Sequence, residues 1–344
     1  MTRTFRWSLS AVSAAALSLG MLAGPAAAAE WKFALEEVDG SVQDAYAEAF
    51  KKRIEEKTGG DVTINIYPYG SLGTSTQTTE LVANGALQLA NASPGHLGKL
   101  IEPIQVFSIP YLLPKEDECT KQILGGSDVL YDSLSEEFAS QGLKLLTMYP
   151  EGEMVWTANK KITSPEDFNN FKMRVMTSPL LVRAYEAFGA NPTPMPYSEV
   201  YSGLQLGQID GQVNPMFAIE EMKFYEVQDY MIWAGQQEFT TTVIANSDFY
   251  NGLSEDHKAA LDSTVEEMVD VIFKIQNEYN QERLETIKNS DNAPEMIRLS
   301  DAQREPFRKA AQKVEAKFVE MTGDSGERVL NALKEEIAAC EKSM

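Results

Sequence analysis

Short apolar runs alternate with amphipathic helical segments from Trp31 onward, and this alternation constrains the fold of the chain more than any other feature. The run that starts at Trp31 predicts a strand, and Ser41 is placed to cap a helix that Gly59 ends. Residues 62–67 alternate between apolar and polar side chains, and a further short strand is expected at residues 88–91. Repeated strand–helix–strand units build mainly parallel sheets covered by helices, so we predict an α/β fold of that kind.

The rest of the pattern predicts two lobes. A strand at residues 143–149 leads into a first crossing at Pro150, and a strand of threonine and valine at residues 239–245 leads back. We therefore expect a two-lobed protein whose lobes are joined by paired crossover strands. The expected boundaries are residues 30–151 with 240–279 for lobe I, and residues 152–239 with 280–344 for lobe II. Between these parts we also expect a strand at residues 104–111 and helices at residues 116–125 and 128–140.

The end of the chain is predicted to be helical. Helical periodicity begins near Ser254 and continues with breaks at residues 289–294 and 322–325. The first of these helices should run for more than about 30 residues without the heptads of a coiled coil, so we expect it to span both lobes.

Residues 1–29 have the features of a secretory signal peptide. Arg3 and Arg6 precede an apolar run that is shorter than the ~20 residues a membrane helix needs, and small residues follow as far as Ala29. We expect cleavage near Ala28 or Ala29, where no cysteine offers a lipid anchor. No later segment is apolar enough to insert into a membrane, so a periplasmic location is predicted.

The chain is strongly acidic, with a formal net charge of -21, which becomes -23 when the two arginines of the signal are removed. This charge excludes nucleic acid as a partner, because its phosphates would be repelled, and it excludes binding to anionic lipid by charge alone. Two explanations of the acidic surface stay open: a solvated coat suited to saline surroundings, or a face that docks on a basic partner.

The only two cysteines are Cys119 and Cys340. An exported protein meets oxidising conditions, in which an even pair of cysteines can form a disulfide. The sequence gives no distance between them, so a bridge and two free thiols both stay open. Neither cysteine has a CxxC spacing or a neighbouring histidine, so no metal, cofactor or nucleophile is predicted.

The stretch around Arg174 carries the strongest candidate for a binding site. Residues 171–175 predict a strand with Arg174 among apolar neighbours, helical segments follow at residues 180–188 and 198–206, and a turn rich in glycine and asparagine ends with Asn214. A guanidinium on a strand that faces such a turn can donate two parallel hydrogen bonds to a planar carboxylate. The alternative is an arginine paired with a surface acid.

No pattern in the sequence indicates catalysis. His257 follows two acids at a helix start, and His96 lies in a loop without a serine elbow or an evident partner acid. There is no phosphate loop, no GxGxxG after a strand and no HExxH. Glu36 and Glu37 are adjacent, and on a strand they would point to opposite faces, which argues against a carboxylate pair. We therefore expect a protein that is not an enzyme.

Four segments in a fixed order resemble the signature of one family. They are Lys172-Met173-Arg174-Val175, Pro192-Thr193-Pro194-Met195, Ser198-Glu199-Val200-Tyr201 and Asp210-Gly211-Gln212-Val213-Asn214-Pro215. Together they resemble the periplasmic solute-binding proteins of tripartite ATP-independent (TRAP) transporters, of the C4-dicarboxylate-receptor type. The resemblance extends over nearly the whole mature chain.

This resemblance implies a two-domain receptor that closes on a small carboxylate-bearing solute and delivers it to the small and large permease subunits in the membrane. It implies that Arg174 holds the solute carboxylate, with Asn214 beside it. A solute that touches both lobes would favour the closed state. A receptor that serves a signalling partner instead of a permease is the alternative.

Within this family the sequence is closest to the ectoine and hydroxyectoine receptors. The stretches that carry this likeness are Glu36 to Asp44, Ser93-Pro94-Gly95, Met148 to Met154 and Asn214-Pro215-Met216-Phe217. Ectoine is a zwitterion, so Arg174 would suit its carboxylate, Glu37 its cationic ring, and aromatic faces would surround that ring. The predicted site comprises Arg174, Asn214, Glu37, His96, Tyr197, Phe217, Trp156 and Ser93. For Trp156, Tyr197 and Phe217 the alternative is plain core packing. For Glu37 the alternative is a surface position at the end of a strand.

The chain departs from these receptors at three positions. The resembled proteins have a phenylalanine and two tryptophans where this chain has His96, Tyr197 and Ala218, which weakens a cage for a cation. Met154 stands where sialic-acid receptors carry a second arginine, which weighs against highly anionic solutes. We expect a zwitterionic or hydroxylated small carboxylate, with ectoine-type solutes as its leading member and a sugar acid or another organic acid as the alternative.

Overall fold

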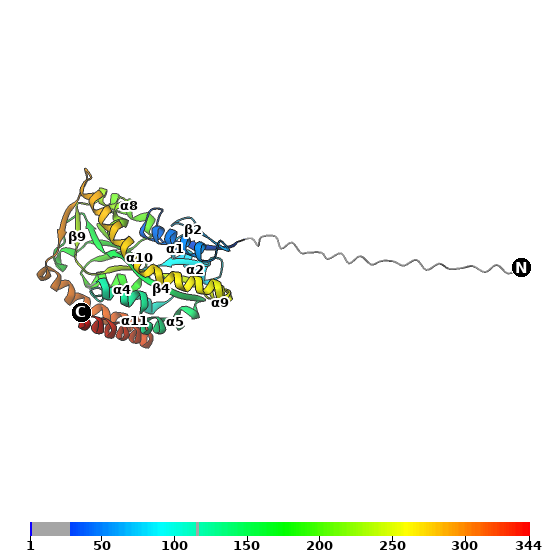
Figure 1. The fold of residues 1–344 in the computed structure, drawn as a ribbon. Coiled ribbons are helices and arrows are strands. Elements are labelled where there is room, and N and C mark those ends of the chain that lie inside the picture. The colour runs from blue at the N-terminus through cyan, green and yellow to red at the C-terminus, as the bar shows by residue number, and fades with distance from the viewer. Residues whose placement is uncertain (2–27, 115–116) are drawn as a thin grey trace.

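The computed structural model describes residues 1, 28–114 and 117–344, which form two mixed sheets surrounded by helices (Figure 1). The predicted signal peptide lies almost wholly outside these residues. Within the described part of the chain, no helix combines the length and the apolar character needed to cross a bilayer.

The first sheet has the strand order β2-β1-β3-β10-β4 in the described residues. Its strands are β1 (Ala29–Ala34), β2 (Val62–Tyr67), β3 (Leu89–Ala92), β4 (Leu143–Glu153) and β10 (Glu238–Asn246). β1 runs parallel to both β2 and β3, and β10 runs antiparallel to both of its neighbours. The carboxyl ends of β1 and β3 therefore meet at one edge of the sheet, where the chain continues into Glu36 and Ser93.

The second sheet has the order β11-β9-β5-β8-β6-β7 in the part that is described. Its strands are β5 (Val155–Ala158), β6 (Lys172–Val175), β7 (Asn191–Pro194), β8 (Gly211–Asn214), β9 (Tyr230–Trp233) and β11 (Glu295–Arg298). β6 is parallel to β7 and β8, and β11 to β9, whereas β5 is antiparallel to both neighbours. The predicted α/β class is confirmed. Both sheets contain antiparallel pairs, because the strands next to the crossings, β4, β5 and β10, run against their partners.

Helices lie around both sheets. The shorter ones are α1 (Val42–Lys57), α2 (Ser75–Ala83), α3 (Pro94–Leu97), α4 (Asp117–Gly126), α5 (Asp128–Ser140), α6 (Pro179–Ala187), α7 (Val200–Gln205), α8 (Met216–Glu221) and α9 (Ser247–Gly252). Ser41 caps α1 as predicted, since its side chain accepts a hydrogen bond from the amide of Asp44 at 3.1 Å.

Two long helices complete the fold. α10 (Glu255–Lys288) has 34 residues and runs across the front of the molecule in Figure 1. It contacts α1 and β4 on the side of the first sheet and α8 on the side of the second, so the predicted brace is confirmed. α11 (Asp301–Ser343) lies along the bottom of the same view, and its helix is interrupted at Gly323, whose φ is 62°. This kink falls at the predicted break.

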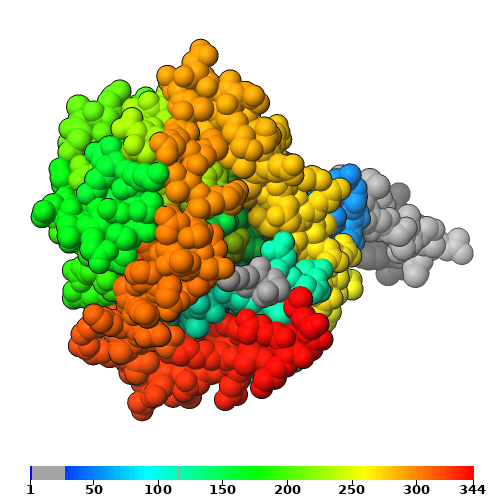
Figure 2. Space-filling view, turned by 90° about the vertical axis from the view of Figure 1, so that its left-hand side faces the viewer, coloured from blue at the N-terminus to red at the C-terminus, as the bar shows by residue number. Residues whose placement is uncertain are grey.

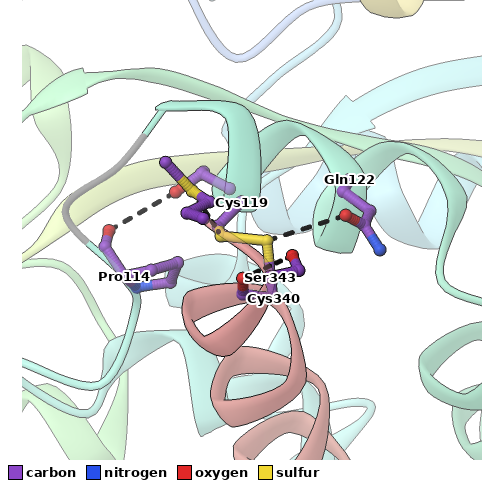
Figure 3. Close-up of a disulfide and its surroundings, with 7 residues drawn as sticks. Pro114, Cys119, Gln122, Cys340 and Ser343 are labelled. Carbon is purple, nitrogen blue, oxygen red and sulfur yellow. Dashed lines mark hydrogen bonds between the residues drawn. A yellow bond between two sulfur atoms is a disulfide. The ribbon is translucent and has the colours of Figure 1, made fainter.

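The end of α11 is joined to the first half of the chain. Cys119 on α4 and Cys340 on α11 form a disulfide, with their Cα atoms 5.8 Å apart (Figure 3). Beyond the kink, buried apolar residues such as Leu330 and Leu333 pack in one cluster with Ile123 of α4. The lobe boundaries stay a prediction, and this packing leads us to propose that the part of α11 after the kink belongs with lobe I.

Two local predictions are wrong. Residues 104–111 were expected to form a strand, but a 3-10 helix, η1 (Glu102–Ser108), begins there with Pro103 in its first turn, where the missing amide hydrogen is not needed. The expected turn before Pro215 is the buried strand β8, whose central position in the sheet outweighs the weak strand preference of glycine and asparagine. The strand β11 was not predicted.

Candidate functional site

A narrow cavity lies where elements of the two sheets meet, and we call it the cleft; its volume is about 370 Å³ when the solvent space at its open mouth is included. The residues that line it are Glu36, Glu37, His96, Arg174, Met176, Tyr197, Asn214, Pro215, Phe217, Ala218 and Phe239. The acids and the histidine follow β1 and β3 of the first sheet, while the arginine and the asparagine lie on β6 and β8 of the second. The cleft therefore has the position typical of ligands in α/β proteins, beyond the carboxyl ends of parallel strands.

Arg174 is fully buried on β6 and has one nitrogen to spare. Its Nε and Nη2 donate to the carbonyl of Met195 at 3.0 and 2.9 Å. Its Nη1 is buried and has no hydrogen-bond partner among the described residues. Burial lowers the pKa of Arg174 to about 10, because desolvation disfavours the charged guanidinium. A buried cation with free donors is costly unless an anion pairs with it, so this corner of the cleft suits a carboxylate.

Asn214 is oriented by a chain of buried polar side chains. Its Nδ2 donates to Oε1 of Gln212, and Nε2 of Gln212 donates to Oγ1 of Thr157 at 3.1 Å. Thr157 in turn donates to Oε1 of Gln228 at 3.0 Å. These bonds connect β8 to β5 and to Gln228, which precedes β9, and they fix the amide that lines the cleft beside Arg174.

Glu36 and Glu37 both line the cleft, which corrects the expectation that they face opposite ways. β1 ends at Ala34, so the alternation of a strand does not apply to them. Glu36 accepts a hydrogen bond from the amide of Ser93 at 2.8 Å, and its other oxygen lies 3.0 Å from Nδ1 of His96. Ser93 does not line the cleft, but its Oγ is 3.1 Å from the same ring nitrogen, so it helps to hold His96 in place.

Glu37 has a second carboxyl behind it. Its Oε2 accepts a hydrogen bond from the amide of Gln43 at 3.1 Å, and Nε2 of Gln43 donates to Oε1 of Glu151 at 3.0 Å. Burial, with the charge of Glu151, raises the pKa of Glu37 well above its ordinary value, and burial raises the pKa of Glu151 to about 7. Sequence reasoning missed Glu151 because it read this position only as a crossing between lobes.

Aromatic side chains form one wall of the cleft. Phe217 is buried, and Tyr197 packs edge-on against Tyr69 with ring centroids 5.8 Å apart. The hydroxyl of Tyr197 is buried and has no partner in the described structure. His96, Tyr197 and Ala218, the three positions at which we expect from the sequence that the chain departs from the ectoine-type receptors, all line the cleft. Their substitutions therefore alter the cleft wall itself.

The long helix α10 reaches the cleft wall through Asn280. Its Oδ1 accepts a hydrogen bond from the amide of Phe217 at 3.2 Å, and its Nδ2 donates to the carbonyl of Glu151 at 2.7 Å. One amide on α10 thus joins the crossing strand β4 to the start of α8.

Trp156 lies away from the cleft, contrary to the prediction. Its Nε1 donates to the hydroxyl of Tyr185 at 2.9 Å, and its ring packs on Phe168 and Phe307 with centroids 5.0 and 5.3 Å away. The side chain points from β5 into the core of the second sheet, where it is only 1% exposed. Core packing, the alternative considered for this residue, describes its position.

Six of the eight predicted site residues surround one cavity, namely Glu37, His96, Arg174, Tyr197, Asn214 and Phe217. Ser93 does not line the cavity, but it forms hydrogen bonds with two residues that do, Glu36 and His96. Trp156 belongs to a separate core. Met176 and Phe239 complete the wall and were not predicted, since an apolar residue in a cleft has the same sequence signal as one in a core. Contact of any of these residues with a solute stays a prediction.

A cavity that lies between two α/β halves joined by crossover strands is the arrangement of a bilobed solute-binding protein. Comparison with known families agrees, because the profile of the bacterial extracellular solute-binding proteins, family 7, matches residues 33–322. The chain belongs to this family, and the protein is periplasmic.

Two curated relatives match almost the whole chain. The chain is 43% identical to the ectoine-binding periplasmic protein of Halomonas elongata over 97% of either chain. It is 42% identical to the ectoine/5-hydroxyectoine-binding periplasmic protein of Ruegeria pomeroyi, over 98% of this chain and 99% of that one. A high-resolution structure of the Halomonas elongata protein superimposes with a TM-score of 0.86 at 44% identity, covering 90% of this chain and 99% of the other.

Proposed function

We propose that the protein is the solute receptor of a TRAP transporter and that it binds a small zwitterionic carboxylate of the ectoine type in the cleft. The Halomonas elongata relative binds ectoine and belongs to a TRAP transporter, and the Ruegeria pomeroyi relative binds ectoine and 5-hydroxyectoine. The proposal extends these solutes and the membrane permease partners to this chain on the basis of near full-length similarity.

The observation that carries the proposal is the free Nη1 of Arg174. A buried guanidinium whose other nitrogens are already bound to a carbonyl can receive one more acceptor, and a carboxylate oxygen gives the strongest such bond. The amide of Asn214 lies in the same wall and can bond the second oxygen without adding charge.

The charges opposite Arg174 favour a zwitterion over a dicarboxylate. Glu36 and Glu37 line the cleft, and the histidine beside them is already engaged with Glu36. Met154, the position of a second arginine in sialic-acid receptors, is a buried apolar side chain here. A second solute carboxylate would meet acids, whereas a cationic ring would be stabilised by them.

The proposed mechanism is binding and release without a chemical step. Arg174 and Asn214 belong to the second sheet, and Glu37 and His96 follow strands of the first, so a solute held at both ends stabilises the closed arrangement. Crossover strands β4 and β10 are the elements that would bend as the two halves separate. The closed form is then the state that membrane subunits would recognise.

A thermal-shift screen of the mature chain tests the class of solute. We would compare ectoine and 5-hydroxyectoine with D-glucuronate and succinate over the same series of concentrations, since a solute adds ~2.7 kcal/mol of stability once it reaches about 100 times its dissociation constant. The two zwitterions should bind at the lowest concentrations. Tighter binding of succinate would contradict the role of Glu37, and tighter binding of D-glucuronate would favour the sugar-acid alternative.

The substitution Arg174→Ala tests the site. Loss of the guanidinium should weaken ectoine binding at least ~100-fold, about 3 kcal/mol, because the solute carboxylate would be buried without a partner. Arg183→Ala on α6 is the matched control, since Arg183 is exposed and pairs only with Glu186 at 2.8 Å in the described structure. Titration calorimetry measures both variants, and unchanged affinity in Arg174→Ala would show that the site is elsewhere.

A further inference from the structure

Glu151 is a fully buried acid that the proposed binding mode does not use. It lies on β4 at the crossing between the sheets, behind Glu37 as seen from the cleft. One of its oxygens accepts from Gln43, and the other, Oε2, is buried without a partner in the described part of the chain. A buried carboxylate with an unused oxygen is costly, so its place here needs an explanation.

Gln43 on α1 holds the two acids in a fixed relation. Its backbone amide donates to Glu37 at 3.1 Å, its side-chain Nε2 donates to Glu151 at 3.0 Å, and its Oε1 accepts from the amide of Glu36 at 2.8 Å. All the hydrogen-bonding groups of this side chain that face the acids are therefore occupied. Because Gln43 binds both carboxyls, Glu37 and Glu151 are held close together, and their mutual repulsion in a buried place favours a state in which one of the two carries a proton.

The surroundings of this acid pair, Glu37 and Glu151, offer little positive charge. The titratable and charged groups around the pair come from the loop after β1, α1, α3, β4, β6, η3 (Tyr197–Glu199), α8 and α10, and are Glu36, Tyr46, His96, Tyr149, Arg174, Tyr197, Glu221 and Arg283. Most are acids or neutral phenols. Among the described residues, His96, Arg174 and Arg283 act on Glu36, Tyr197 and Glu221, and no cation forms an ion pair with Glu37 or Glu151. A cation brought by a solute would be the missing counter-charge.

We propose that Glu151 is a positioning residue that sets the specificity of the cleft: with Glu37 and Gln43 it holds one proton in the solute-free protein, and the cationic group of a solute displaces that proton into the solvent. This inference rests on the proposed binding of a zwitterion. In this proposal Glu37 contacts the solute, and Glu151 acts on the solute only through Glu37. The proton balance is simple, because the pair changes from one negative charge to two as the solute cation arrives.

The consequence is an affinity that rises with pH. The pKa of Glu151 is raised to about 7 and that of Glu37 is raised as well, so below neutrality the solute-free pair keeps its proton and a cation must displace it. Ectoine affinity should therefore increase with pH, by at most about tenfold per pH unit for each proton displaced, until the pH passes the pKa at which the solute-free pair loses its last proton. A sugar acid has no cationic group and should show no such increase.

The substitution Glu151→Gln should weaken this dependence of affinity on pH. A glutamine has nearly the same shape and can donate its amide to Glu37, but it carries no exchangeable charge. The pKa of Glu37 should then fall, because burial still raises it but the charge of Glu151 no longer does, and ectoine affinity should depend less steeply on pH than in the wild type. A merely structural role of Glu151 would lower affinity equally at every pH.

Titration calorimetry with ectoine at about pH 6, in two buffers of different ionisation enthalpy, counts the protons released. We expect about one proton for the wild type and clearly fewer for Glu151→Gln. Glu238→Gln is the matched control, because burial raises the pKa of Glu238 to about 8 although this residue does not line the cleft. It should release as many protons as the wild type. Release of no proton by the wild type, or equal release by Glu151→Gln, would overturn the proposal.

A second measurement needs no solute. Carbon-13 NMR of the glutamate carboxyls in the solute-free protein should show two groups that titrate together near neutrality, and Glu151→Gln should move the remaining one to lower pH. If both carboxyls titrate below about pH 5, the acid pair is refuted even if ectoine binds. If the coupled titration is present and ectoine does not bind, the proposed function fails and the acid pair stands.

Discussion

Two hollows lie at the junction of the sheets, and the larger one is not the proposed site. The second hollow, which we call the hinge cavity, has a volume of about 1230 Å³ against about 370 Å³ for the cleft, when the solvent space at their open mouths is included. It is lined by both crossover strands, by α10 and by the start of α11, and includes Tyr111, Glu153, Gln237, Glu238, Asn277 and Arg304. Figure 2 shows a hollow bordered by the yellow and orange segments that contain α10 and the start of α11.

The two hollows differ in how their charges are balanced. In the hinge cavity, Arg304 lies 4.0 Å from Asp301 and acts on Glu153, which also accepts a hydrogen bond from the amide of Gly235 at 3.0 Å. Both arginines have one buried nitrogen without a hydrogen-bond partner, but Arg174 in the cleft, unlike Arg304, pairs with no acid of the described residues. This difference indicates that volume alone does not identify a binding site. A buried charge without an acid partner, such as that of Arg174, is the better indicator.

The largest effect, on stability, is expected from loss of the disulfide that joins α4, a helix lining the hinge cavity, to α11. Replacing both Cys119 and Cys340 by serine should lower the free energy of unfolding by about 4 kcal/mol, because the disulfide closes a very long loop in the unfolded chain. Ectoine affinity should not change, since neither cysteine lines the cleft. Urea denaturation measures the loss, with the reduced wild type as control. A loss of affinity would mean that the two hollows are coupled more closely than the comparison implies.

A smaller effect should separate two acids, one from each hollow. Glu37→Gln should weaken ectoine binding about 30-fold, about 2 kcal/mol, because the cationic ring loses its charged partner. Glu238→Gln changes the hinge cavity by the same chemistry and should leave affinity within about twofold at pH 8. Equal losses in the two variants, measured by calorimetry, would contradict the distinction between the hollows.

The smallest effect concerns a residue that lies in neither hollow. Trp156→Phe should lower stability by about 1 kcal/mol, because the hydrogen bond to Tyr185 is lost while most of the ring packing remains. Ectoine affinity should stay the same. If affinity falls with little change in the denaturation midpoint, Trp156 has a role in the cleft that its position does not reveal.

The sequence was most informative where local chemistry is specific. An arginine among apolar neighbours on a short strand predicted Arg174, and two acids beyond a strand predicted Glu37. Trp156 was misplaced because every residue of β5 is buried, so alternation along the strand cannot tell the cleft side from the core side. Glu151 could not be predicted, because its partners on α1 and after β1 are brought to it only by the tertiary fold.

Residues 104–111 show the same limit on the fold. Their apolar run is compatible with a strand or a buried helix, and length does not separate these possibilities in so short a segment. By contrast, the long helix α10 was predicted in kind and extent, since periodicity over many turns admits one interpretation.

The amide of Asn280 has a mechanical consequence. Gly152, next to Glu151, has a φ of 130° and lies so close to this amide that an added Cβ would be 2.5 Å from Nδ2. Glycine at this position leaves room for the side chain of Asn280 on α10 to reach the carbonyl of Glu151 on β4. A movement of β4 at Gly152 would therefore be passed through the side chain of Asn280 to the amide of Phe217. The crossover strand and the Phe217 wall of the cleft would then move together.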